Sequence, residues 1–225
     1  MKNFNYLIII LLGFSQISTG NSLIPFEPAD NSQFINLHPH FQWEGPEMWI
    51  DYTPEVRIQI AEDDGFVNII DEDVIGGGVN RYYSMVSLSP GQSYWWRVKL
   101  ENPQNEWSGE WSTIQKFTVI NPDKTIKINA FDLPVTIDQK LDDAENFANN
   151  GESVEISFEK GNYTLSSDEE YIINLSNVNG FRIEGNGSTI TLIDRREFAS
   201  IEQSMNIEIR NLKITDSYPG HALLT

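Results

Sequence analysis

Two residues near the C-terminus could form an acid–base pair. Asp216 is followed closely by His221. A histidine titrates near neutral pH, and a nearby carboxylate can orient its ring for proton transfer. A complete catalytic set is recognised by geometry that spacing does not supply. Asp216 and His221 are thus weak candidates for catalysis. The catalytic residues are otherwise unknown.

Tryptophans form a second group of candidates, for carbohydrate binding. Trp95 and Trp96 are neighbours in an extended segment, so their rings must point to opposite faces. If Trp96 lies in a core, Trp95 lies on the surface, where with Trp49 or Trp107 it could stack on sugar rings. The alternative for these rings is packing at a sheet edge or against a second domain.

Adjacent arginines add a further binding candidate. Arg195 and Arg196 lie in a charged loop between Asp194 and Glu197. Two guanidinium groups could bind a carboxylate or sulfate through paired hydrogen bonds. A solvated loop with internal ion pairs is the alternative.

Histidines and acidic clusters are the candidates for metal binding. His38 and His40 are predicted on one side of a strand, but no cysteine, third histidine or spaced carboxylate completes a ligand set. The acidic runs 63–64 and 71–73 lack the glycine and terminal glutamate of an EF-hand loop. Aspartate-rich turns explain these runs. We predict no metal site, and calcium is the one cofactor that the acidic composition leaves open.

The composition of the chain limits the kinds of molecule that it can bind. The 225 residues include 33 acidic and 15 basic side chains and no cysteine, for a formal charge of −18. Such a charge works against binding nucleic acid. Without disulfides, stability must come from packing, and this length supports two domains.

Residues 1–20 predict a signal peptide. Lys2 gives a positive start, the run from Tyr6 to Phe14 is apolar, and Gly20 suits the cleavage site. The run is shorter than the roughly 20 apolar residues that span a bilayer, although an uncleaved anchor is the alternative. We expect a secreted or cell-surface protein, extracellular or periplasmic, with no membrane span after cleavage.

Residues 21–121 predict an antiparallel β-sandwich. Apolar and polar residues alternate in short runs, such as 56–60 and 66–70, between Gly, Pro, Asn and Asp. Pro90 and Gly91 lead into a strand that starts at Tyr94, which suits a tyrosine corner. The pattern resembles a fibronectin type III domain, with Trp43 as the core tryptophan. The other residues that carry the resemblance are Leu88, Trp96, Val98, Gly109, Trp111, Ser112, Phe117 and Val119.

A helix and a repeat follow a polar link at 121–124. Apolar residues recur at helical spacing from Ile137 to Ala148, with Thr136 as the expected N-cap and Gly151 as the stop. Paired apolar residues then recur about every 25 residues, as stacked β-coils require. The pairs are Ile156/Phe158, Phe181/Ile183 and Ile207/Ile209. In this register Ser157, Arg182 and Glu208 form one outward ladder, in which Arg182 pairs with Glu208.

This helix, the strand 154–158 and the turn from Gly161 to Tyr163 resemble the start of right-handed parallel β-helix proteins of the pectate lyase-like superfamily. The resemblance implies a mainly β chain in which residues 122–225 form a capping helix and the first coils. Because Thr225 falls in mid-strand, we expect the natural protein to continue. The superfamily places its chemistry on middle coils, so this chain alone is expected to be inactive.

The leading hypothesis is the N-terminal part of a secreted polysaccharide-active protein, a lyase or glycoside hydrolase, with the sandwich as accessory or spacer module. Polysaccharide is the expected partner. The alternative is a non-catalytic cell-surface adhesion or carbohydrate-binding protein. Fold resemblance alone does not decide between them. The substrate and the oligomeric state do not follow from the sequence.

Overall fold

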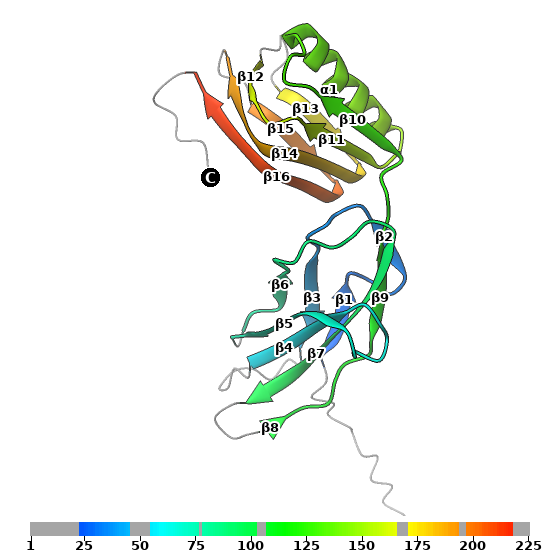
Figure 1. Cartoon of the computed structure of the whole chain (residues 1–225). Coiled ribbons are helices and arrows are strands. Elements are labelled where there is room, and N and C mark those ends of the chain that lie inside the picture. The colour runs from blue at the N-terminus through cyan, green and yellow to red at the C-terminus, as the bar shows by residue number, and fades with distance from the viewer. Residues whose placement is uncertain are drawn as a thin grey trace, which may run out of the picture.

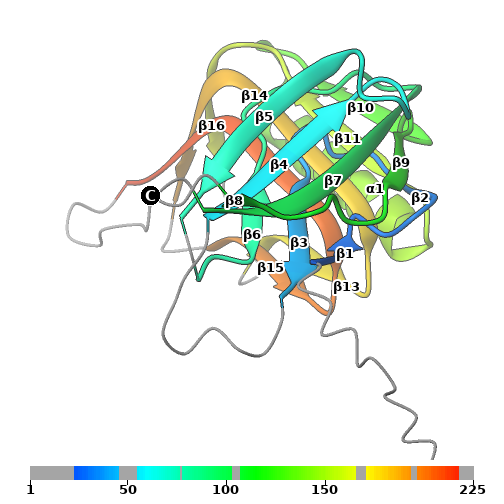
Figure 2. The ribbon, with the colours of Figure 1, turned by 90° about the horizontal axis from the view of Figure 1, so that it is seen from below.

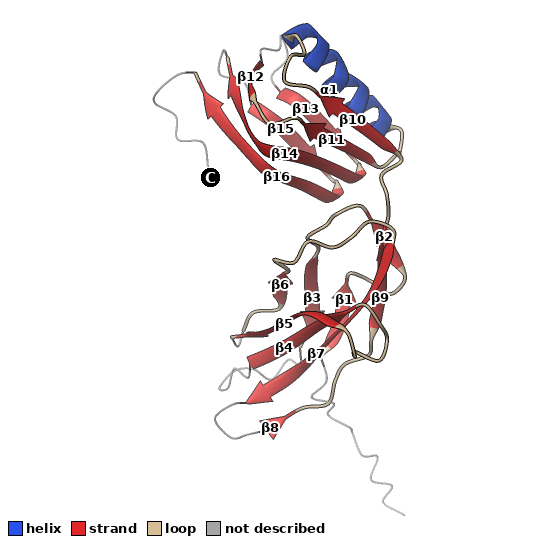
Figure 3. Cartoon of the chain, in the orientation of Figure 1, coloured by secondary structure: helices blue, strands red, loops and turns tan. Residues whose placement is uncertain are grey.

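The structure, a computed structural model, describes residues 23–45, 55–76, 78–102, 107–165, 171–193 and 197–217. These residues hold sixteen strands and one helix, and the chain is mainly β (Figure 3). Their buried apolar side chains form two separate cores, one before and one after residue 121. We call residues 23–119 the two-sheet unit and residues 124–217 the parallel unit. The predicted signal peptide lies outside the described residues.

No helix within these described ranges is long and apolar enough to cross a membrane.

The two-sheet unit has two β-layers that pack face to face around one core (Figure 2). Neighbouring strands are antiparallel, except that β2 runs parallel to β9. The smaller sheet contains β1 (Ile24–Glu27), β3 (His40–Glu44) and β6 (Arg81–Tyr83). The larger sheet contains β2 (Ser32–Phe34), β9 (Gln115–Val119), β7 (Gln92–Asn102), β4 (Glu55–Ala61) and β5 (Ile69–Ile75), with β8 (Trp107–Ser108) beside β7.

Alternation along β7 builds the core of this unit. Tyr94 and Trp96 point inward, as do Val98 and Leu100, and Trp96 is fully buried, as predicted. Its ring meets Phe41 edge to face, with centroids 5.2 Å apart. The Tyr94 hydroxyl accepts a hydrogen bond from the Ser89 backbone N–H at 2.9 Å, so the predicted tyrosine corner is present.

The strand expected at 66–70 is displaced. The Asp63 carboxylate accepts hydrogen bonds from the backbone N–H groups of Val67 and Asn68, which closes a turn. Phe66 adopts a positive φ of 54° there, and β5 begins only at Ile69. The acidic run 71–73 therefore lies within a strand and not in a turn, because the turn occupies the residues before it.

The parallel unit stacks its strands in parallel on three faces. Strands β14 and β16 are long enough to pass from one face to the next. The first two faces form one continuous sheet. Its strands, in hydrogen-bonded order, are β10 (Lys124–Ile128), β11 (Val154–Phe158), β14 (Asn179–Leu192) and β12 (Asn162–Leu165), and β16 (Met205–Asp216) also pairs with β14. The last face contains β13 (Tyr171–Ser176) and β15 (Glu197–Glu202).

The predicted repeat is present, but the predicted pairing of the strand 154–158 with the strand that contains Arg182 is wrong by two residues. Ile156 lies beside Ile183, which lies beside Ile209. The outward ladder therefore starts with Glu155 and not with Ser157. A slip of two residues keeps the same side chains inside and outside, so alternation alone cannot exclude it.

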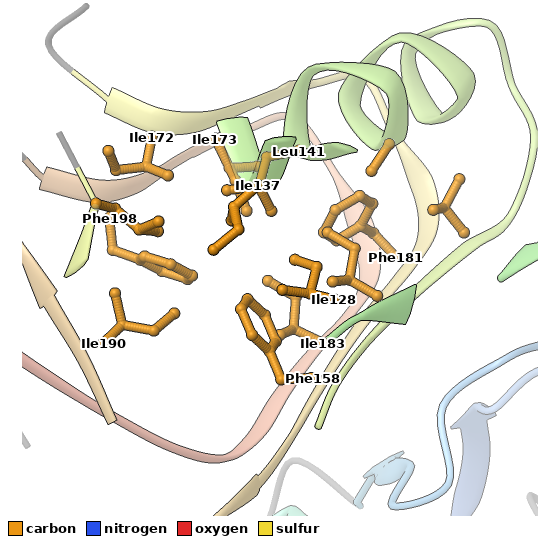
Figure 4. Packing of buried hydrophobic residues seen from close by; sticks show 14 of the residues in the cluster. Ile128, Ile137, Leu141, Phe158, Ile172, Ile173, Phe181, Ile183, Ile190 and Phe198 are labelled. Carbon is orange, nitrogen blue, oxygen red and sulfur yellow. The ribbon is translucent and has the colours of Figure 1, made fainter. Parts of the chain in front are cut away.

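Helix α1 (Pro134–Asn149) covers one end of the parallel unit (Figure 1). Ile137 and Leu141 point from it into the core that contains Ile183 (Figure 4). The expected N-cap at Thr136 is wrong, because the helix starts at Pro134, whose fixed φ suits a first helical position.

Arg182 joins the two units. It stands on β14, is only 5% exposed, and donates to the backbone carbonyl of Ile35 at 2.5 Å. Its second partner is the Glu155 carboxylate on the neighbouring strand β11. Arg182 and Glu208 do stack, as predicted, but the ion pair of Arg182 is with Glu155.

Glu208 makes the next contacts along this junction. One carboxylate oxygen accepts the Leu37 backbone N–H, and the other lies 2.9 Å from Nδ1 of His38. Arg210 lies 2.8 Å from the same His38 nitrogen and forms an ion pair with Glu184. The segment 35–38 of the two-sheet unit is thus held by charged side chains of the parallel sheet.

We expect Tyr94→Phe to lower the free energy of unfolding by about 1 kcal/mol, because it removes the acceptor of the Ser89 N–H. Urea titration measures this change. Tyr83→Phe, at a tyrosine that is 59% exposed, is the matched control. Equal unfolding midpoints for the two variants would show that the corner contributes nothing.

Candidate carbohydrate-binding face

The odd-numbered residues of β7 point away from the core and form the centre of a polar and aromatic surface. We call this surface the outer face; it lies on the larger sheet, on the side opposite the core. Its members come from β4, β5, β7 and β9 and from two adjoining segments. They are Arg57, Gln59, Phe66, Glu72, Trp95, Arg97, Lys99, Glu101, Trp111 and Lys116.

Arg97 lies between two aromatic rings on this face. Its guanidinium carbon is 3.8 Å from the centroid of Phe66 and 4.1 Å from that of Trp111. Gln59 accepts two hydrogen bonds from the same guanidinium group, at 2.7 and 3.0 Å. Burial lowers the pKa of Arg97 from its ordinary value. The stack fixes the guanidinium plane through attraction between the cation and the ring faces.

Trp95 has a similar but looser pairing. It lies opposite Lys116 in the register of β7 and β9, and the Lys116 ammonium is 5.3 Å from the ring centroid. Trp95 is half-buried, as the prediction of a surface ring requires. Among the residues that the structure describes, no carboxylate forms an ion pair with Arg97 or Lys116.

The other cations of the outer face are neutralised. Arg57 donates to Glu101 at 2.7 Å and to Glu72 at 2.8 Å, and Lys99 lies 2.9 Å from Glu101. A hydrogen bond from Arg57 lowers the pKa of Glu101 below its usual range, and a hydrogen bond from Lys99 contributes a smaller effect in the same direction. Hydrogen bonds from Gln59 and then Arg57 lower the pKa of Glu72.

This arrangement can bind a sugar. An indole face can pack on the C–H side of a sugar ring, and a flanking ammonium can hold a hydroxyl or a carboxylate. Trp95 and Lys116 supply these two elements side by side. Trp111 already has Arg97 and Lys99 over its ring, at 4.1 and 4.8 Å from the centroid.

The outer face contains one predicted binding residue, Trp95. For Trp107 and for the catalytic candidate Asp216 the structure places the backbone in β8 and β16 but leaves the side chains undescribed. The remaining candidates lie outside the described residues, so these assignments stay predictions. They are Trp49, Arg195, Arg196 and His221.

The two histidines do not share a site. His40 lies 3.2 Å from Glu27 within the two-sheet unit, whereas His38 faces the parallel unit. The proline between them separates a bend from the start of β3. In the described part of the chain, no group of three or more histidines and carboxylates could hold a metal ion. Binding of calcium stays a prediction.

Apart from Trp95, the members of the outer face were not predicted as binding residues, among them Arg97, Lys116 and Phe66. The signal for Arg97 was available, because it follows Trp95 at the two-residue period of a strand. Lys116 becomes a neighbour only through the pairing of β7 with β9. Phe66 reaches Arg97 from the turn that displaced the predicted strand.

No protein-family model matches the chain, and no curated protein matches it. Among solved structures it is similar to a fibronectin type III domain of the human KIAA0970 protein, at 16% identity over 47% of this chain and 80% of that chain, with a TM-score of 0.33. It is also similar to pectate lyase PelI from Erwinia chrysanthemi, at 13% identity over 87% of this chain and 61% of that chain, with a TM-score of 0.31. Pectate lyase Pel3 from Pectobacterium carotovorum is 7% identical over 87% and 69%, with a TM-score of 0.33. Likeness at this level concerns the fold and says nothing about activity.

We expect the unfolding free energy to fall as the pH drops below about 4.5, because Glu72 and Glu101 have lowered pKa values in the folded state. Such groups stabilise the fold above their unfolded pKa and lose this contribution as the pH falls through the folded pKa. Urea titrations at a series of pH values measure the effect. Glu101→Gln should flatten the profile, whereas Glu197→Gln, at an exposed glutamate, should not. Parallel profiles for both variants would contradict this account.

Proposed function

We propose that this chain is the polysaccharide-binding module of a secreted polysaccharide-active protein, a lyase or glycoside hydrolase. In this proposal residues 1–20 are the signal peptide, residues 21–121 a fibronectin type III-like sandwich, and residues 122–225 a capping helix with the first coils of a right-handed parallel β-helix. The tyrosine corner, the parallel register and the helix over one end support this division.

The observation that carries the proposal is the pairing of rings with cations on the outer face. In a chain with a charge of −18, Arg97 and Lys116 lie against Trp111 and Trp95 and not against carboxylates. Arg57, on the same face, is instead paired with Glu72 and Glu101. A half-buried ring beside an unneutralised ammonium suits a glycan that carries hydroxyls or carboxylates.

We expect Trp95→Ala to weaken retention of the chain on immobilised polysaccharide roughly two- to tenfold, since aromatic packing is worth about 0.5–1.5 kcal/mol. Affinity electrophoresis in gels that contain neutral or acidic polysaccharides measures the retention. Phe131→Ala is the matched control, because this ring is 94% exposed and lies beyond the outer face. If both variants run like the wild-type chain in every gel, the outer face is not a binding surface.

A further inference from the structure

A cavity of about 440 Å³ lies where the two units meet. Phe26, Glu27, Asn36 and His40 line it from the two-sheet unit, and Met205 lines it from the start of β16. Figure 1 shows β16 beginning on the side of the parallel unit that faces the two-sheet unit. Its volume lies within the range of about 300–1,000 Å³ that small-molecule sites occupy. Because both units supply walls, separation of the units would remove the wall that contains Met205.

Two large apolar side chains in this cavity are open to solvent. Phe26 is 41% exposed and Met205 is 65% exposed. Such side chains present an aromatic ring and a deformable thioether to whatever enters.

The cavity also contains polar groups that lack partners. Asn36 is nine-tenths buried, and its side-chain oxygen has no hydrogen bond; the hydroxyl oxygen of Ser32 has none either. An unpaired buried acceptor is costly to the fold. A small rotation of the Asn36 amide toward a bound hydroxyl would satisfy it.

The remaining polar groups indicate which ligand fits. Glu27 and His40 pair at 3.2 Å, which leaves a carboxylate and an imidazole at the wall. Among the described residues that line the cavity there is no lysine or arginine, so a carboxylated ligand would meet Glu27 without such a cation beside it. Hydroxyl groups can donate to Glu27 and Asn36 and can accept from His40.

We propose that this junction cavity is a second binding site, which takes a neutral sugar unit, with Phe26 under the sugar ring and Asn36 and Glu27 bound to its hydroxyls. The class of ligand rests on the proposed function, whereas the site is built from different residues than the outer face. A sugar that touches both walls favours the docked arrangement of the two units. Arg182→Met, which loosens the junction, should therefore weaken this binding as well.

The test uses the full chain with Trp95→Ala, which removes the main contact of the outer face. Isothermal titration calorimetry follows the binding of neutral tetrasaccharides of glucose, xylose or mannose, with tetragalacturonate as the acidic probe of equal length. We expect a neutral tetrasaccharide to bind more tightly than tetragalacturonate. Adding Phe26→Ala should lower its affinity about tenfold, and adding Phe131→Ala should leave it unchanged.

Asn36→Leu separates binding from stability. Leucine keeps the shape of the side chain and removes the unpaired oxygen, so the variant should melt at the same or a higher temperature. Its affinity for the neutral tetrasaccharide should nevertheless fall. Full affinity in a folded Asn36→Leu or Phe26→Ala variant would overturn the cavity site.

The remaining outcomes separate this site from the proposed function. If the wild-type chain binds tetrasaccharides and the Trp95→Ala chain binds none, the cavity site is overturned and the outer face stands. If tetragalacturonate binds the Trp95→Ala chain more tightly than every neutral probe, the assigned ligand class is wrong. If no probe binds the wild-type chain, both proposals fail.

Discussion

Arg182 carries a buried charge that the fold must satisfy at the boundary between its two units. A guanidinium group that is 5% exposed is costly unless ion pairs and hydrogen bonds replace its water. Glu155 supplies the charge from the same unit, but the Ile35 carbonyl comes from the other one. Separation of the units would leave this hydrogen bond unmade. Because docking takes the water from this guanidinium group, the Ile35 carbonyl must replace a hydrogen bond that water would otherwise accept.

The two proposed binding surfaces differ in whether they depend on this docking. Segment 35–38 contacts the parallel unit, while the outer face belongs to the larger sheet on the side away from its core. The outer face therefore needs only the two-sheet unit to be folded, and it retains cations that suit acidic or neutral glycans. The junction cavity has walls from both units, and its carboxylate, Glu27, is paired with His40. On the outer face, Arg97 and Lys116 lie over aromatic rings.

Patterns of residues close together in the sequence predicted much of the fold. They did not predict contacts between segments that are far apart in the sequence. Alternation placed Trp96 inside and Trp95 outside, and the turn before Tyr94 predicted its corner, because these depend on residues close in sequence. The register of the first coil was wrong, since a shift of two residues preserves alternation. No side-chain pattern could reveal that Arg182 binds a backbone carbonyl at Ile35. The cavity was equally hidden, because its walls meet only after the two units dock.

The most direct test of this account is the hydrogen exchange rate of the Leu37 backbone amide, measured by NMR. This N–H is donated to the Glu208 carboxylate across the junction at 2.9 Å, so its protection reports docking and not the stability of either unit alone. Docked units predict exchange that is much slower than in an open loop, with the protection lost in Glu208→Ala while β4 amides stay protected. Exchange at the rate of an unprotected loop in the wild-type chain would contradict the account.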